Sequence, residues 1–210
     1  MSEPVEEAAR AALARELIVI PTDTVYGIGT RPDDPRATAR LFEAKGRPRE
    51  LELPVLVPGV AAAREIAAFD ERAEALALRY WAGPLTIVLA RAERSRGWDL
   101  GGDPETVGIR MPHHPLALAV LARTGPLAVT SANRSGRPTP ETCDEVRKVF
   151  GGSVAIYLCD DAQAGPRTVR RPSTVLDLAH GRMRVLRAGA VGDRELREAL
   201  VSSGLDEPRV

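Results

Sequence analysis

The sequence predicts a single α/β domain built on one largely central β-sheet. Short apolar runs that read as strands alternate roughly one for one with amphipathic segments that read as helices, a pattern typical of α/β folds. The 210 residues match one ordinary domain, and a hydrophobic content of 44% is enough for a sizeable core. Because no internal repeat, low-complexity block or linker interrupts the pattern, we predict one domain over residues 1–210. Its core spans about 13–192, after an N-terminal helix at 1–12 and before a frayed tail at 202–210.

The elements follow from local signals taken in chain order. Asp34 and Pro35 read as an N-cap and a first-turn proline, Asp70 as a second N-cap, and Thr139 as a third. The charged, glycine-containing stretch 91–103 reads as a mobile surface loop. The predicted helices cover 3–15, 35–44, 61–68, 70–80, 115–123, 140–150 and 193–201, and the predicted strands cover 17–20, 53–57, 85–90, 106–110, 127–130, 154–158, 174–178 and 183–186.

Composition excludes several classes of function. Lys and Arg total 29 and Asp and Glu total 29, so no global field attracts nucleic acid or membrane, although a local basic patch remains open. The longest apolar runs are too short to cross a bilayer, and the N-terminus lacks a basic-then-apolar start, so we predict a cytoplasmic protein. Cys143 and Cys159 have no metal-ligand spacing, and we expect free thiols in a reducing compartment. Neither a dinucleotide-binding nor a P-loop glycine motif occurs.

The segment Ala-Lys-Gly-Arg at 44–47 places two cations two residues apart. Pro48 disfavours helical geometry at Arg47, so we predict an extended segment in which the Lys45 and Arg47 side chains point the same way. Adjacent cations repel each other unless an anion lies between them, and a triphosphate suits a planar guanidinium beside a point-like ammonium. The alternative is a solvated helix C-terminus, where Lys and Arg are common.

Small polar clusters follow several predicted strands, at the edge where open α/β sheets bind ligands. One is the loop Pro21–Gly27, whose threonines and aspartate otherwise read as turn and cap residues. Others are Ser131-Ala132-Asn133 and the cation Arg187.

The strand 106–110 alternates, so Thr106, Gly108 and Arg110 share one face. A threonine and an arginine on one strand face suit an anionic small molecule. The alternative is an exposed face of the sheet.

Together, five motifs resemble those of the YrdC-like family of threonylcarbamoyl-AMP synthases. They are Pro21-Thr22-Asp23-Thr24-Val25-Tyr26-Gly27, Lys45-Gly46-Arg47-Pro48, Ser131-Ala132-Asn133, Pro172-Ser173-Thr174-Val175-Leu176-Asp177 and Arg187-Ala188-Gly189. The match extends from about Leu17 to Gly189, in the family's order and nearly its spacing. The resemblance implies a single domain of the short form, with a twisted, mixed β-sheet flanked by helices around a large, positively lined cavity.

The resemblance implies an enzyme, a nucleotidyltransferase that condenses L-threonine, bicarbonate and ATP into threonylcarbamoyl-adenylate and releases pyrophosphate. The product feeds the threonylcarbamoyladenosine modification of transfer RNA, so the implied partners include the downstream threonylcarbamoyl transferase machinery and transfer RNA or double-stranded RNA. Mg²⁺ is expected with ATP, bridging its phosphates, and no protein side chain is expected to bind it. The threonine amine can attack bicarbonate, and the carbamate oxygen can then attack the α-phosphorus. The protein therefore has to align the reactants and neutralise phosphate charge.

The resemblance also assigns roles by position. The catalytic residues are expected to be Lys45, Arg47, Ser131 and Asn133. The expected ATP-binding residues are Lys45, Arg47, Thr106, Ser131, Asn133, Thr139 and Arg187. The expected threonine-binding residues are Thr24, Arg110 and Ser173.

One segment departs from the family pattern. After Lys-Gly-Arg-Pro the family usually has Asn-Pro-Leu-x-x-His, whose Asn and His contact ATP and threonine. In this sequence the segment 49–58 is two residues longer than the family pattern, and Leu53 and Pro58 stand at the positions of its Asn and His. Glu50 and Glu52 are expected near the phosphate region. The alternative interpretation is a diverged paralogue that binds structured RNA or nucleotide without this activity. A third is another carbamoyl-adenylate enzyme, of the kind found inside larger carbamoyltransferases.

Overall fold

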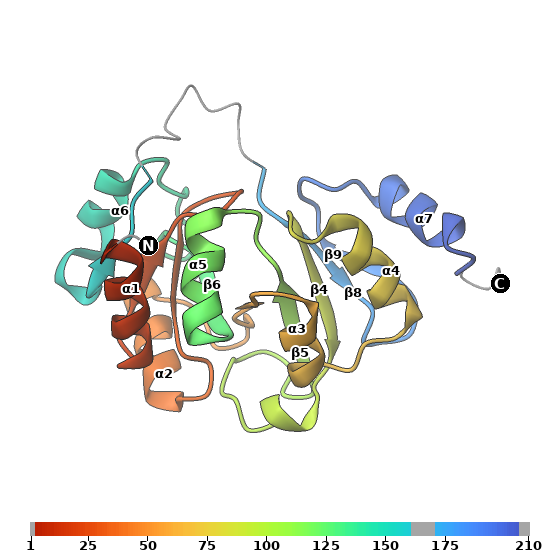
Figure 1. Ribbon diagram of the computed structural model, residues 1–210, viewed down its shortest axis with the longest axis horizontal. Helices are drawn as coiled ribbons and strands as arrows, with labels where there is room; N and C mark the ends of the chain where they lie inside the picture. The colour runs from red at the N-terminus through yellow and green to blue at the C-terminus, as the bar shows by residue number, and fades with distance from the viewer. Residues whose placement is uncertain (1–2, 161–170, 206–210) are drawn as a thin grey trace.

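The computed structural model describes residues 3–160 and 171–205, and these form one nine-stranded mixed sheet with helices packed against it (Figure 1). The strands are β1 (Ile18–Ile20), β2 (Gly27–Thr30), β3 (Val55–Leu56), β4 (Leu85–Ala90), β5 (Thr106–Arg110), β6 (Leu127–Ser131), β7 (Ile156–Tyr157), β8 (Thr174–Asp177) and β9 (Arg184–Arg187). The helices are α1 (Glu3–Leu13), α2 (Pro35–Lys45), α3 (Val60–Ile66), α4 (Glu71–Tyr80), α5 (Pro115–Thr124), α6 (Cys143–Phe150) and α7 (Asp193–Ser202), with 3-10 turns η1 (Glu93–Ser95) and η2 (Gly151–Ser153). The predicted α/β class is confirmed, while the end of the predicted tail, 206–210, lies outside the described residues.

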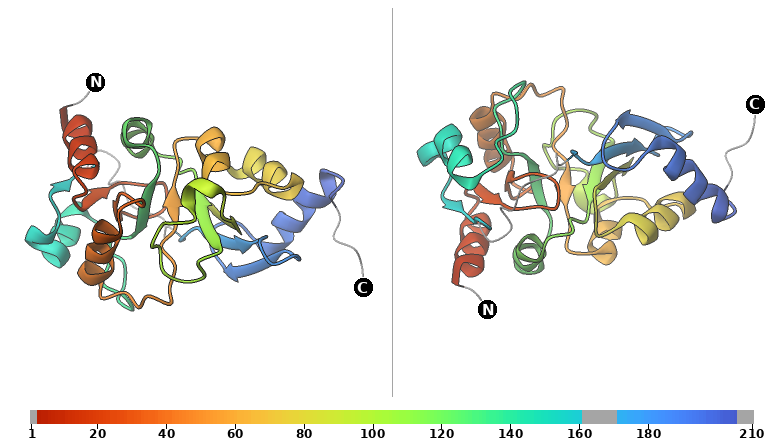
Figure 2. Two further views of the ribbon diagram at one scale, coloured as in Figure 1. Left: turned by 90° about the horizontal axis from the view of Figure 1, so that it is seen from below. Right: turned by 90° about the horizontal axis from the view of Figure 1, so that it is seen from above.

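The strands do not follow chain order within the sheet. Their spatial order is β7-β1-β2-β6-β3-β5-β4-β8-β9. Three neighbouring pairs are parallel, namely β1 with β7, β3 with β5 and β4 with β8, and the other pairs are antiparallel. Helices α1, α2 and α6 lie at the β7 end of the sheet, and α4 and α7 lie side by side at the β9 end (Figures 1 and 2).

The two faces of the sheet are covered unequally. On one face, α1 and α5 pack on β1 and β6 in a cluster that includes Leu56 and Val129. On the other face, α2, α3, α4, α6 and α7 enclose a larger core that takes Val107 and Ile109 from β5. Because neighbouring residues of a strand point to opposite faces, Gly108 and the other alternate residues of the β5 and β4 strands point to the first face, beyond the reach of α1 and α5. A hollow is left there.

Strand β2 was not predicted, because its sequence Gly-Ile-Gly-Thr has the composition of a loop. The fold needs both glycines. A Cβ atom on Gly27 would lie 2.5 Å from Cγ1 of Val129, and a Cβ on Gly29 would lie 2.5 Å from the carbonyl oxygen of Ala128. The glycines therefore let β2 pair closely with β6 despite their poor strand propensity.

The predicted helix cap at Thr139 was wrong. Helix α6 begins after Thr142, because Thr142 and Glu145 form a capping box, so Thr139 stays in the preceding loop and caps nothing. The stretch 91–103 lies at the surface, as predicted, with Glu93, Arg94 and Arg96 exposed, but Leu100 within it is fully buried. The buried guanidinium of Arg91 donates hydrogen bonds to the carbonyl oxygens of Ser95, Trp98 and Thr106, which fastens the stretch to β5.

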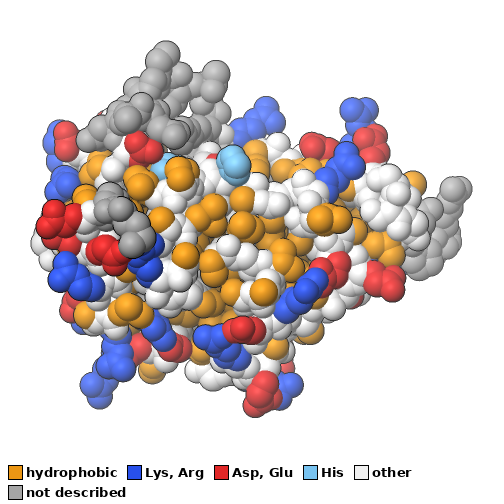
Figure 3. All heavy atoms as spheres, in the orientation of Figure 1, with side chains coloured by type: hydrophobic (Ala, Val, Ile, Leu, Met, Phe, Trp, Pro, Cys, Tyr) orange, Lys and Arg blue, Asp and Glu red, His pale blue; other side chains and the backbone are white. Residues whose placement is uncertain are grey.

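The surface agrees with the balanced composition. On the face shown in Figure 3, Lys and Arg side chains alternate with Asp and Glu side chains around a central apolar area. No helix within the described ranges is long and apolar enough to cross a membrane. The face in Figure 3 therefore carries no broad field of one sign.

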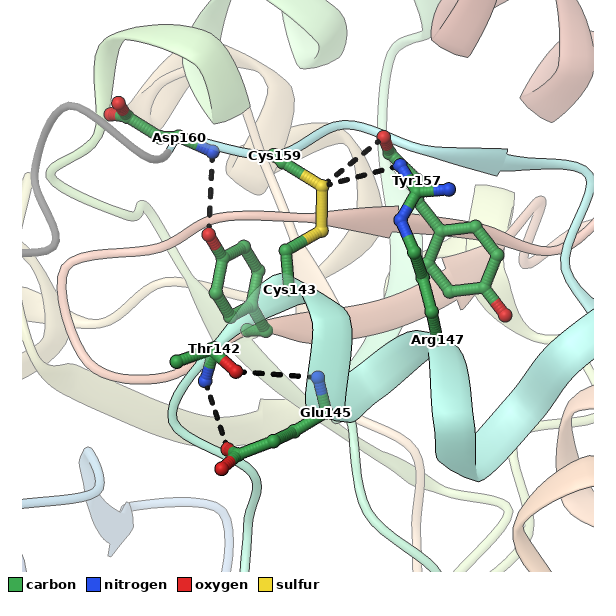
Figure 4. The surroundings of a disulfide bond; sticks show 8 residues. Thr142, Cys143, Glu145, Arg147, Tyr157, Cys159 and Asp160 are labelled. Atoms are coloured by element: carbon green, nitrogen blue, oxygen red, sulfur yellow. Dashed lines mark hydrogen bonds between the residues drawn. A yellow bond between two sulfur atoms is a disulfide. The ribbon is translucent and has the colours of Figure 1, made fainter.

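The expectation of two free thiols was wrong, because Cys143 and Cys159 form a disulfide. It joins the start of α6 to the end of β7, with Cα atoms 5.7 Å apart (Figure 4). The side chain of Arg147 reaches toward the sulfur of Cys159. Sequence spacing gave no sign of this pairing, because the fold alone brings the two residues together.

We expect Cys159→Ser to lower the free energy of unfolding by about 3 kcal/mol, because the disulfide closes a short loop in the unfolded chain. The separation of 16 residues sets that magnitude. Urea denaturation of oxidised wild type, reduced wild type and the variant measures the effect. Reduced wild type should match the variant, and equal stability of oxidised and reduced wild type would show that the bridge contributes nothing.

Candidate functional site

The hollow on the sheet is a cavity of about 540 Å³. Its floor comes from the strands that α1 and α5 leave uncovered, and its walls come from loops at the strand ends. The lining residues used below are Thr22, Thr24, Arg47, Glu52, Pro54, Leu56, Thr86, Gly108, Arg110, Ser131, Thr139, Ser173 and Arg187.

Most of the predicted site residues come together in this cavity. Those that line it are Thr24, Arg47, Arg110, Ser131, Thr139, Ser173 and Arg187. Lys45, Asn133 and Thr106 are outside the lining. Thr106 is 4% exposed on the Gly108 face of β5, and its carbonyl oxygen accepts the hydrogen bond from Arg91. These placements leave the individual roles as predictions.

Lys45 and Arg47 are not two residues of one extended segment, so that prediction was wrong. Helix α2 continues to Lys45, and Gly46 ends it in the left-handed region at φ 59°. The amide of Arg47 donates back to the carbonyl oxygen of Phe42. This helix-ending motif is favoured by glycine, and because of it the side chains of Lys45 and Arg47 leave the backbone in different directions.

The Lys45 side chain is buried, with 1% exposure, and reaches the turn after β6. Its Nζ donates hydrogen bonds to the carbonyl oxygens of Ser131 at 2.5 Å and Asn133 at 2.6 Å. Burial, and secondarily the charge of Arg47, lowers the pKa of Lys45 to about 7. Lys45 therefore anchors the loop that carries Ser131 into the cavity.

Asn133 also holds this loop together. Its Oδ1 accepts from the Ser131 hydroxyl at 2.6 Å, and its Nδ2 donates to the carbonyl oxygens of Arg134 and Arg137. The Ser-x-Asn pair thus orients one hydroxyl toward the cavity and stiffens the chain behind it. Thr139, further along the same loop, lines the wall.

The two cations that converge on the cavity are Arg47 and Arg187, which lie 140 positions apart in the sequence. Burial, and secondarily the charge of Arg187, lowers the pKa of Arg47, while the charge of Glu52 opposes that shift. Arg47 donates to the carbonyl oxygens of Leu51 and Glu52, and Arg187 donates to the carbonyl and hydroxyl oxygens of Ser173. Within the described residues, neither forms a salt bridge. The pair therefore favours an anion between them.

A third arginine lies in a differently built part of the cavity. Arg110 is 6% exposed, and it donates to Asp23 at 2.6 Å, to Thr24 at 3.0 Å and to the carbonyl oxygen of Gly83 at 2.9 Å. Asp23 also accepts from the amide of His113. Burial lowers the pKa of Arg110, and the Asp23 carboxylate opposes that shift. Asp23, which was not predicted as a site residue, thus fixes the orientation of this guanidinium.

The divergent segment 49–58 reaches the cavity through Glu52, one of the two glutamates expected there, and not through Leu53 or Pro58. Leu53 is fully buried, and neither Leu53 nor Pro58 lines the cavity. Glu52, Pro54 and Leu56 do, because alternate residues of this extended segment face the hollow. That alternation is visible in the sequence, and it indicates that Glu52 is the polar side chain of this segment that faces the cavity.

Comparisons with known proteins agree with this geometry. Residues 11–189 match the Sua5/YciO/YrdC family model, described as "Telomere recombination". A Mycobacterium tuberculosis relative, whose name assigns it provisionally as a threonylcarbamoyl-AMP synthase, is 40% identical over 95% of this chain and 90% of its own. The Bacillus subtilis threonylcarbamoyl-AMP synthase is 34% identical over 95% of this chain and 59% of its own.

A solved structure of Pyrococcus abyssi Sua5 complexed with L-threonine superposes with a TM-score of 0.82. It is 32% identical, and the match covers 93% of this chain and 57% of that one. The chain thus spans little more than half the length of the P. abyssi and B. subtilis proteins. With the motifs, the cavity and the family match over most of its length, the chain belongs to the Sua5/YciO/YrdC family.

Proposed function

We propose that this protein is a threonylcarbamoyl-AMP synthase, which condenses L-threonine, bicarbonate and ATP into threonylcarbamoyl-adenylate and pyrophosphate. The observation that carries the proposal is the convergence of three arginines on one cavity of about 540 Å³. Within the described residues neither Arg47 nor Arg187 forms a salt bridge, whereas Arg110 is oriented by Asp23 beside Thr24. Relatives that are 34–40% identical carry the same name.

The two kinds of arginine suit two different anions. Arg47 and Arg187 bind the phosphates of ATP, since forked guanidinium groups match phosphate oxygens and stabilise charge that builds on them. Arg110 binds the threonine carboxylate, with Thr24 beside it. The Ser131 hydroxyl donates its proton to Asn133, so its oxygen accepts a hydrogen bond from a hydroxyl or amino group of the nucleotide, in the loop that Lys45 anchors. The carbamate oxygen is then held in line with the α-phosphorus, which is the main contribution an enzyme without a covalent intermediate can make.

Mg²⁺ enters this scheme with its nucleotide as part of the substrate. Within the described residues, no group of three or more His, Cys, Asp or Glu side chains is arranged to hold a metal ion. The cation bridges phosphate oxygens and leaves its remaining positions to water. We place the reaction in the cytoplasm, where the adenylate passes to a threonylcarbamoyl transferase acting on transfer RNA.

The test is threonine-dependent release of pyrophosphate from Mg-ATP and bicarbonate by the purified chain. We expect release that stops when threonine or bicarbonate is omitted. Release that needs no threonine would instead indicate another carbamoyl-adenylate enzyme. Absence of release, combined with binding to structured RNA that weakens steeply with salt, would indicate a diverged RNA-binding paralogue.

A further inference from the structure

Glu52 is a carboxylate inside the arginine-lined cavity, and the contacts proposed above give it no role. Its Oε1 accepts a hydrogen bond from the amide of Gly108 at 3.0 Å. Strand β3 begins only at Val55, so the Gly108 amide lies beyond the end of the neighbouring strand and the side chain takes the place of a strand partner. The carboxylate is therefore held at a fixed position on β5.

The second oxygen of this carboxylate remains available to a ligand. Within the ranges 3–160 and 171–205, Oε2 of Glu52 accepts no hydrogen bond. Burial raises the pKa of Glu52 to about 7. The Gly108 amide and the cations Arg91 and Arg47 act against this shift, and the carboxylate of Asp103 adds to it. Near neutral pH the group exists in both protonation states, as a proton acceptor requires.

Glu52 and Arg110 line the same cavity with opposite charges, and Glu52 is tied to the strand that carries Arg110. Gly108, which holds Glu52, and Arg110 are two residues apart on β5, about 6.7 Å along the strand. An α-amino acid is a zwitterion whose ammonium and carboxylate groups are attached to the same carbon. A molecule whose carboxylate binds Arg110 can therefore direct its ammonium toward Glu52.

We propose that Glu52 binds the α-ammonium group of the amino-acid substrate and accepts the proton that the amine loses when the carbamate forms. This inference rests on the proposed function. In that step the ammonium and bicarbonate react, a nitrogen–carbon bond forms, and a carbon–oxygen bond of bicarbonate breaks. The products are the carbamate and one water molecule, and the single remaining proton passes to the Glu52 carboxylate. Charge and atoms balance without any further reactant.

A second use for a carboxylate in a nucleotide site is to accept hydrogen bonds from ribose hydroxyls. Hydroxyls need only an acceptor, however, and a neutral amide serves them nearly as well. An ammonium requires the negative charge, and only proton transfer uses a group that titrates near the working pH. These requirements let one variant separate the two roles.

The test is Glu52→Gln, because the amide oxygen still accepts from the Gly108 amide and the fold is kept. We expect kcat/KM for threonine to fall by about 100-fold at neutral pH, with the KM for ATP changed by less than about twofold. The wild-type kcat/KM should rise as pH increases through about 7, where Glu52 ionises, and then level off. The variant should keep rising toward about pH 9, as the amine of threonine loses its proton unaided.

The reverse reaction supplies the deciding readout. Threonylcarbamoyl-adenylate and pyrophosphate give ATP and N-carboxythreonine without the proton transfer assigned to Glu52, so Glu52→Gln should form ATP at the wild-type rate. Equal slowing in both directions with a raised KM for ATP would assign Glu52 to the nucleotide and overturn the proposal. Unchanged forward kinetics would also overturn it.

Glu50→Gln is the matched control, because Glu50 is exposed in the same segment and outside the cavity lining. It should behave as wild type in both directions. A wild-type protein that releases no threonine-dependent pyrophosphate would defeat the proposed function itself. An active wild type with an equally active Glu52→Gln variant defeats only the inference about Glu52.

Discussion

Replacing Arg47 by alanine is expected to lower threonine-dependent pyrophosphate release by at least about 100-fold, while the melting temperature stays close to that of wild type. Arg47 and Arg187 are partly buried cations that line one cavity, and burial lowers the pKa of each. Such a pair gains most when phosphate charge enters between them, and it stabilises charge that increases in the transition state. The hydrogen bonds that Arg47 donates to the carbonyl oxygens of Leu51 and Glu52 are exposed or only half-buried, so the empty protein loses little stability without them.

Arg49→Ala is the matched control for this experiment. Arg49 belongs to the same segment, but its guanidinium pairs with Asp99 at 2.6 Å and lies over the ring of Phe42, away from the cavity. Its loss should leave the rate within about twofold, since exposed ion pairs contribute at most about 1 kcal/mol. Arg47→Lys keeps the charge without the planar fork and should recover part of the lost rate. An Arg47→Ala enzyme with a wild-type rate would remove Arg47 from the phosphate site.

The parts of the fold that were predictable are those determined by neighbours in sequence. The caps Asp34 and Asp70 accept hydrogen bonds from the amides that local rules specify. The alternation along β5 correctly separated Arg110 from the core residue Ile109. Residues that follow strand ends, such as Ser131, reached the cavity because the ends of neighbouring strands meet there.

Several failures depend on partners that lie far away in sequence, although the failed cap at Thr139 has a local cause, the Thr142–Glu145 capping box. The Lys45 ammonium selects carbonyl oxygens 86 and 88 residues away, whereas a local rule for residues i and i+2 pointed it at the ligand. Arg47 and Arg187 line the same cavity although most of the chain separates them in sequence. Strand β2 is stabilised by close contact with β6, which its own glycine-rich composition conceals. Local sequence patterns therefore identified most of the residues that line the cavity, but not which residues contact one another.

Lys45→Met is expected to reduce both activity and stability, unlike Arg47→Ala. The variant keeps the apolar stem but removes the donor to the carbonyl oxygens of Ser131 and Asn133. The carbonyl oxygen of Ser131 keeps the hydrogen bond from the amide of Asn133, but the half-buried carbonyl oxygen of Asn133 loses the lysine donor, and we expect a loss of about 2 kcal/mol in the free energy of unfolding. The loop that positions Ser131 loosens, so pyrophosphate release should fall by at least about 100-fold.

The pH dependence of the free energy of unfolding tests whether the Lys45 side chain causes the stability difference between wild type and Lys45→Met. The pKa of Lys45 is 10.5 in the unfolded reference and about 7 in the folded protein, so between these values the unfolded chain binds more protons. The lysine's contribution to the free energy of unfolding therefore rises with pH over that window. The stability difference between wild type and Lys45→Met should widen from about pH 7 upward, as measured by urea denaturation at several pH values.

Lys148→Met is the matched control, since Lys148 is the other lysine of the chain and is exposed on α6. It should change neither the rate nor the pH dependence. A Lys45→Met protein that is fully stable but inactive would contradict the anchoring role. That result would instead mean that the lysine leaves the carbonyl oxygens and contacts the phosphates when ATP binds, because an anchor cannot be removed without cost to the loop it holds.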